Sequence, residues 1–66
     1  MSKLSFKIFC IEMYAQHKSM SGTAVYQLFE KHDVLEMLDR DYEDLHGFGF
    51  EFIVSDIDEY IQSRST

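Results

Sequence analysis

The chain has 66 residues, and its twelve acidic and six basic side chains give a net charge of −6 at neutral pH. This length supports one domain, near the lower limit at which a hydrophobic core forms without a disulfide or a metal. The single cysteine excludes an internal disulfide and a cysteine-type zinc site. No signal-peptide pattern and no apolar stretch approaching ~18 residues is present, so we expect a cytoplasmic protein with no membrane contact.

The acidic residues concentrate in two blocks, 36–44 and 51–59, whereas the basic residues are scattered. Nucleic-acid binding depends on a positive surface, because phosphate neutralisation supplies most of the sequence-independent affinity. We therefore expect no nucleic acid as a partner, whereas a basic protein is electrostatically favoured. Acidic residues also simply solvate the outer faces of helices, and that interpretation stays open.

The first predicted element is a helix over residues 3–18 that is apolar around most of its circumference. At ~100° per residue, only the arc of Ser5, Glu12 and Gln16 is cleanly polar. Such a helix is normally buried, but a domain of this size buries only about 60% of its unfolded surface. We therefore expect another surface to cover part of this helix.

A turn over residues 19–22 leads into a second predicted helix, with Ser21 as its N-cap and its end near Lys31. Asp33 and Glu36 have the spacing of a capping box, which predicts a third helix ending at Gly47.

Within the third helix Asp41 projects toward the apolar side, so its carboxylate must be hydrogen-bonded, paired or peripheral. We expect it either at the edge of the core or in contact with a partner.

Residues 47–52 alternate small or polar residues with phenylalanine, which predicts a short extended segment but, without a second strand, no sheet. Ser55 and Asp58 form another capping pair, which predicts a short fourth helix. Residues 62–66 are expected to fray. The sequence thus predicts an all-α bundle of about four helices, one domain over residues 1–66 with its core at about 3–62 and the Gly/Phe segment between helices 3 and 4.

Catalytic and metal-binding patterns are missing from the sequence. No histidine stands four residues from another histidine or from Cys10, and no histidine is predicted to activate that thiol. A calcium loop starting at Asp39 fails, because Asp44 and Phe50 occupy its glycine and bidentate-glutamate positions. We expect no enzyme, no cofactor, no metal and no catalytic residue, unless a partner chain completes a site.

The leading hypothesis is an interaction module that occludes a partner protein, with aromatic and methionine side chains as anchors and an acidic rim. An alternative is a homodimer or an intramolecular core, because a symmetric dimer commonly covers surplus apolar surface. A helix-turn-helix is disfavoured, because five acidic residues accompany Arg40 on the would-be recognition helix. The candidate interface residues are Phe6, Phe9, Met13, Tyr14, Asp41, Phe48, Phe50 and Phe52.

Three segments, 9–15, 21–29 and 56–61, together with Leu45-His46 and Ile53-Val54, resemble the small bacterial family called domain of unknown function 3791. The likeness covers nearly the whole chain, although the phenylalanines of residues 48–52 make that segment more aromatic than the family pattern. Members tend to be encoded beside small proteins that include ones resembling ADP-ribosyltransferase toxins. The resemblance therefore implies an antitoxin-like or accessory partner of a neighbouring protein.

Overall fold

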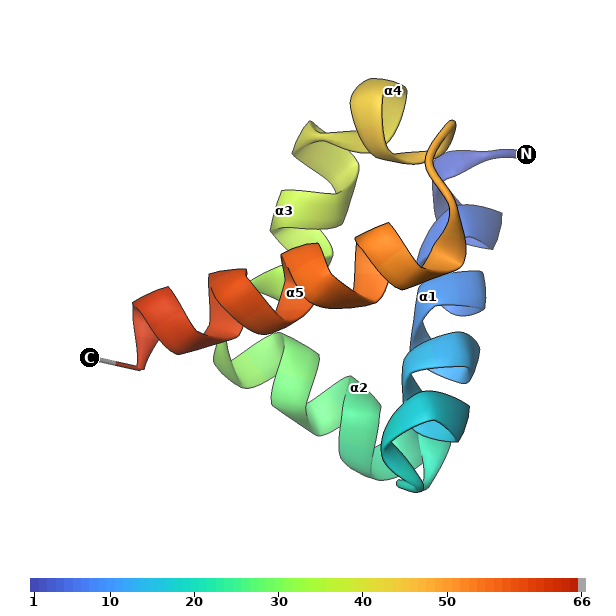
Figure 1. Cartoon of the computed structure of the whole chain (residues 1–66). Coiled ribbons are helices and arrows are strands. Elements are labelled where there is room, and N and C mark those ends of the chain that lie inside the picture. Colours follow the sequence, from blue (N-terminus) through green and yellow to red (C-terminus); the bar gives the residue numbers. More distant parts are fainter. Residues whose placement is uncertain (66) are drawn as a thin grey trace.

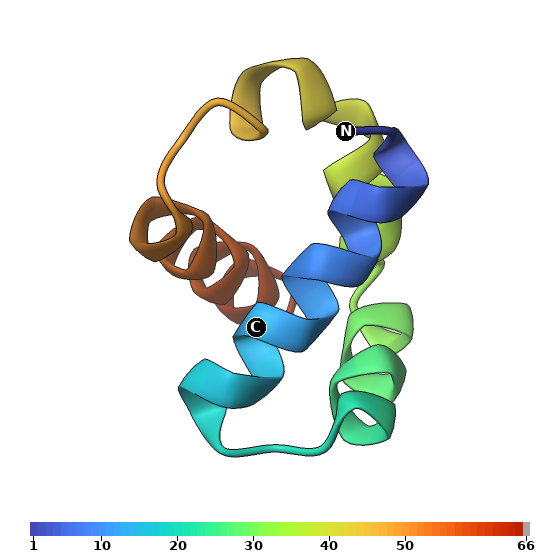
Figure 2. The same cartoon turned by 90° about the vertical axis from the view of Figure 1, so that its right-hand side faces the viewer.

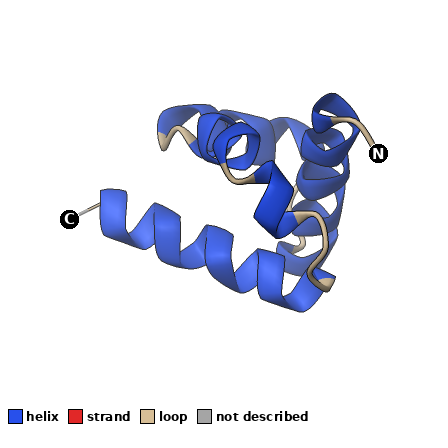
Figure 3. Cartoon of the chain, turned by 90° about the horizontal axis from the view of Figure 1, so that it is seen from above, coloured by secondary structure: helices blue, strands red, loops and turns tan. Residues whose placement is uncertain are grey.

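The computed structural model describes residues 1–65, and helices are the only regular elements within them. In Figure 1, α1 lies along one side of the molecule, and α2 and α3 follow it in chain order. Helix α5 packs across the side that these three helices leave uncovered. Figure 3 shows that only short loops join the helices. The all-α prediction is confirmed. The helices are α1 (Lys3–Lys18), α2 (Gly22–Lys31), α3 (Val34–Arg40), α4 (Tyr42–Leu45) and α5 (Phe50–Arg64).

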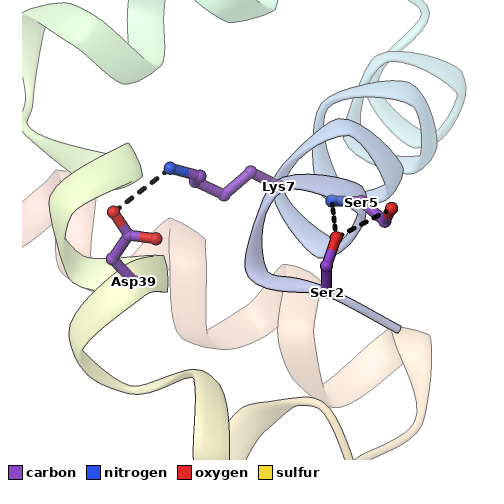
Figure 4. Close-up of polar contacts among 4 residues, drawn as sticks. All are labelled: Ser2, Ser5, Lys7 and Asp39. Carbon is purple, nitrogen blue, oxygen red and sulfur yellow. Dashed lines mark hydrogen bonds and ion pairs between the residues drawn. The ribbon is translucent and has the colours of Figure 1, made fainter.

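Serine side chains cap the first two helices. The Ser2 hydroxyl accepts a hydrogen bond from the Ser5 backbone N–H at 3.1 Å (Figure 4). The Ser21 hydroxyl accepts one from the Ala24 N–H at 3.0 Å, as the sequence predicts. Each cap satisfies an N–H group that has no partner within its own helix. The predicted bounds of both helices are confirmed.

The prediction of one continuous third helix is wrong, because the chain breaks at Asp41 into α3 and α4. The capping box at Asp33 is also wrong. Asp33 has φ 58°, its side chain caps nothing, and its carboxylate forms an ion pair with Arg64 of α5. In an unbroken helix the Asp41 carboxylate would project toward the core. The break lets it pair with Arg40 instead.

The fourth predicted helix begins earlier than expected. The extended segment is wrong for residues 50–52, which form the first turn of α5, and Ser55 lies inside that helix. Gly49 is its N-cap residue, with extended φ and ψ of −68° and 157° and no side chain to cap with. Residues 62–64, predicted to fray, are helical, and Thr66 lies outside the described residues.

The core lies where α1 meets the other long helices, and Figure 2 shows α2 and α5 behind α1 on opposite sides. Two edge-to-face aromatic pairs connect α1 to its neighbours, Phe6 with Tyr42 at 5.4 Å and Tyr14 with Phe29 at 5.2 Å between ring centroids. Such pairs add to the burial energy of the rings. The buried residues are Phe6, Cys10, Tyr14, Ala15, Val25, Phe29, Val34, Met37, Leu38, Tyr42, Leu45, Ile53, Val54 and Ile57.

Candidate interaction surface

Two of the predicted interface residues on α1 belong to the core. Phe6 is 2% exposed and Tyr14 is 4% exposed, so their assignment to an interface is wrong for the folded domain. They lie with Cys10 at intervals of four residues, which places all three on the inner side of the helix. Because α1 is apolar around most of its circumference, the sequence alone does not distinguish the residues that face the core from those that face outward.

Other apolar side chains of α1 face outward. Phe9 is exposed, and Met13, one turn further on, is half-buried, so both stay available to a partner. Leu4 is 65% exposed and Ile8 is 48% exposed, and sequence reasoning did not select either of them as an interface residue. Their four-residue spacing is the signal that could have identified an outer stripe.

The three phenylalanines after α4 divide between the inside and the outside. Phe50 is half-buried, and its ring packs edge-on against His17 of α1 at 5.8 Å. Phe52 lies two residues later, about 200° around the helix, and therefore points the opposite way. It stacks on Phe48 with ring centroids 4.3 Å apart, and each of these two residues is 49% exposed. We call Phe48 and Phe52 the aromatic pair.

Carboxylates flank the aromatic pair along the chain. Glu43 and Asp44 lie on α4, and Glu51 lies in the first turn of α5, where the positive end of the helix dipole favours it. All three are exposed, and none forms an ion pair with any residue in the range 1–65. We call Glu43, Asp44 and Glu51 the acidic rim. An apolar anchor beside unneutralised acids suits a basic, partly apolar partner.

Asp41, the remaining predicted interface residue, is held by its neighbour. Both of its carboxylate oxygens accept hydrogen bonds from the Arg40 guanidinium, at 3.0 and 3.1 Å. Those bonds lower the pKa of Asp41, although burial opposes them. On α5, burial, Asp41 and Glu59 together raise the pKa of Asp56. Of the three states that the sequence left open for Asp41, the structure shows the hydrogen-bonded ion pair, and its role as a partner contact stays a prediction.

A polar cluster joins α1 to α5. The Tyr14 hydroxyl donates to Asp58 Oδ1 at 2.6 Å, and Lys18 Nζ donates to Asp58 Oδ2 at 2.8 Å. Burial and the neighbouring carboxylate raise the pKa of Tyr14. Burial would raise the pKa of Asp58, but the two hydrogen bonds and the charge of Lys18 lower it overall. The cluster aligns two helices and lies apart in sequence from the aromatic pair.

The thiol of Cys10 and the imidazole of His46, which could in principle do chemistry, both make contacts within the fold. Burial raises the pKa of the Cys10 thiol to about 12, so it stays protonated and weakly nucleophilic. His46 stacks on Tyr42 with ring centroids 4.6 Å apart, and its Nδ1 lies 2.8 Å from the Tyr42 carbonyl oxygen. Within residues 1–65, no group of three or more His, Cys, Asp or Glu side chains is placed to hold a metal ion.

A shallow recess of about 150 Å³ lies where α2 meets α3, with Phe29 and Leu35 as its apolar lining and Glu30, Asp33 and Glu36 as its carboxylates. It is smaller than the ~300–1,000 Å³ of most small-molecule sites.

Over the described part of the chain, each helix is too short or too polar to cross a bilayer.

One of three comparisons with known proteins finds a match. A protein-family model described as "Protein of unknown function (DUF3791)" matches residues 5–64, which is nearly the whole chain. No curated protein and no solved structure matches the sequence.

Proposed function

We propose that this chain, which belongs to the DUF3791 family of proteins of unknown function, is a protein–protein interaction module of the bacterial cytoplasm. It binds a basic partner protein through the aromatic pair, Phe48 and Phe52, and acts by covering part of that partner's surface. The observation that carries the proposal is the stack of two phenylalanine rings, each 49% exposed, at the start of α5.

Exposed aromatic rings of this kind suit a binding anchor. Apolar patches on soluble proteins tend to mark interaction sites, and a few large side chains near the centre of an interface supply most of its energy. The two rings are already stacked in the free protein, so binding costs little additional side-chain entropy. A partner side chain that covers both rings removes apolar surface from water on both sides of the contact.

The acidic rim gives the proposed partner its charge. Glu43, Asp44 and Glu51 lie within a few residues of the aromatic pair and stay exposed without ion pairs among residues 1–65. Complementary charge of this kind raises the rate of encounter and discriminates against wrong partners. A neighbouring toxin-like protein with a basic face fits this role, so an antitoxin-like or accessory function is part of the proposal.

The proposal includes no catalytic step and no binding of nucleic acid. Cys10 is buried with a raised pKa, which supports a structural role for the thiol. On α3 the carboxylate of Asp39 binds Lys7, and Arg40 is engaged by Asp41, so this helix offers a phosphate backbone little free positive charge.

Quantitative capture from a lysate of the native host tests the function. The tagged wild-type chain should retain one protein in stoichiometric amount, and the double variant Phe48→Ser, Phe52→Ser should lose it. The matched control is Met20→Ser, which removes an exposed apolar side chain from the turn between α1 and α2. Equal capture by all three proteins, or no stoichiometric protein with the wild type, would contradict the proposal.

A further inference from the structure

The outward side of α5 continues the surface that the aromatic pair begins. Residues four and seven positions apart on a helix point in nearly the same direction, so Phe52, Asp56 and Glu59 share one face. Phe52 is 49% exposed, Asp56 is half-buried and Glu59 is exposed. Figure 3 shows α5 along one edge of the molecule, with no other helix of residues 1–65 on its outer side. We call Asp56 and Glu59 the α5 acids.

The α5 acids have no cation of their own. Neither of them takes part in an ion pair among residues 1–65. The helices that pack against α5 are α1 and α3. Four basic residues of these three helices bind other carboxylates, namely Lys7 with Asp39, Lys18 with Asp58, Arg40 with Asp41 and Arg64 with Asp33.

Asp56 therefore carries an unneutralised charge at the edge of the core. Burial first, and then the charges of Asp41 and Glu59, raise its pKa. A raised pKa means that the folded protein tolerates the ionised carboxylate less well than the unfolded chain does, so this charge destabilises the fold at neutral pH. A basic side chain placed between Asp56 and Glu59 would relieve that destabilisation.

We propose that a lysine or arginine of the partner protein binds between Asp56 and Glu59, while an apolar side chain of the same partner covers the aromatic pair. This contact rests on the proposed function and extends its site along α5. At about 1.5 Å per residue, the two acids lie about 6 and 10 Å along the helix axis from Phe52. The partner must carry its apolar and its basic side chain at that separation.

The two ends of this surface also fix the orientation of the partner. A partner bound the other way round would set its apolar side chain on the α5 acids and leave their charges without a cation. Such a mismatch disfavours the wrong orientation and wrong partners alike.

The stability of the free chain gives the first test. Asp56→Asn removes the charge and keeps the size of the side chain, so the urea midpoint at neutral pH should rise above that of the wild type. Glu12→Gln, which neutralises an exposed carboxylate of α1, is the matched control and should leave the midpoint unchanged. If the midpoint of Asp56→Asn stays the same or falls, the carboxylate is already satisfied within the fold and the proposal is overturned.

Quantitative capture from the native host lysate gives the second test. The double variant Asp56→Asn, Glu59→Gln should retain several-fold less of the captured protein than the wild type. The control Glu12→Gln, Glu36→Gln removes the same two charges at exposed sites of α1 and α3 and should bind like the wild type. Circular dichroism should show the same helicity for all three proteins.

The outcomes separate this contact from the proposed function. Equal retention by the two double variants would overturn the contact at Asp56 and Glu59. If Phe48→Ser, Phe52→Ser still loses the captured protein in that case, the role of the aromatic pair stands. A wild type that captures no stoichiometric protein would contradict the proposed function and this contact together.

Discussion

At the scale of single residues, protonation of the Asp58 carboxylate makes the stability of the fold depend on pH. Hydrogen bonds from Lys18 and Tyr14 outweigh burial and lower its folded pKa below the ordinary 3.8. A lowered folded pKa means that the unfolded chain binds the proton more tightly than the folded one. The stabilisation is therefore present above pH 3.8 and is lost as the pH falls through the folded pKa.

Asp58→Asn should remove this pH dependence. The variant should be less stable than the wild type at neutral pH, because the amide carries no charge to pair with Lys18. The difference should shrink as the pH falls below 3.8, where the wild-type carboxylate also becomes neutral. Urea unfolding of both proteins at a series of pH values measures the two profiles. Parallel profiles would show that Asp58 contributes no linked stability.

Phe6 and Phe52 give a matched test of burial, because both are phenylalanines on helices and only Phe6 is buried. Phe6→Ala should lower the free energy of unfolding by about 3–5 kcal/mol, since it removes a ring from the core and leaves a cavity. Phe52→Ala should change it by less than about 1 kcal/mol. Urea denaturation followed by circular dichroism compares the two. Equal losses would contradict the assignment of Phe6 to the core.

At the scale of helices, the sequence predicts α1 and α2 well because local chemistry determines their ends. Ser21 is an N-cap residue that can be recognised in the sequence, and it marks the start of α2. The periodicity of apolar residues predicts the remainder of the helix. The break at Asp41 and the early start of α5 have no such cap in the sequence. Asp41 caps no helix and pairs with Arg40, and Gly49, the N-cap residue of α5, has no side chain to cap with. The contact of Phe50 with His17 joins distant parts of the chain and is not visible in a local pattern.

The start of α5 offers a test of capping. Gly49 occupies the N-cap with extended φ and ψ, and an added Cβ at that position meets nothing within 4 Å. Gly49→Ser should raise the free energy of unfolding by a few tenths to about 1 kcal/mol, since the hydroxyl can accept a backbone N–H of the first turn.

Gly47→Ser is the matched control for this change. An added Cβ at Gly47 also meets nothing within 4 Å, but Gly47 does not precede a helix as its N-cap. Its effect reports the loss of glycine flexibility in the unfolded chain alone. If thermal or urea unfolding gives equal changes for both substitutions, the cap contributes nothing.

At the scale of the whole molecule, the basic residues are used mainly to join or brace the helices. Lys7, Lys18, Arg40 and Arg64 each bind a carboxylate. Apart from the half-buried Asp56, the acids without an ion pair are exposed and give the surface its negative charge, which the composition alone predicts. Which apolar residues stay outside is different, because that depends on how the helices pack. The sequence predicts Phe48 and Phe52 as interface residues together with Phe6 and Tyr14, and only the structure separates the exposed pair from the buried one.

Hydrogen–deuterium exchange of the chain, alone and in complex with the protein it captures, locates the binding surface. Binding should slow exchange mainly in residues 43–52, which carry the acidic rim and the aromatic pair. Protection confined to α2, or to α1 away from α5, with residues 43–52 exchanging as in the free protein, would contradict it.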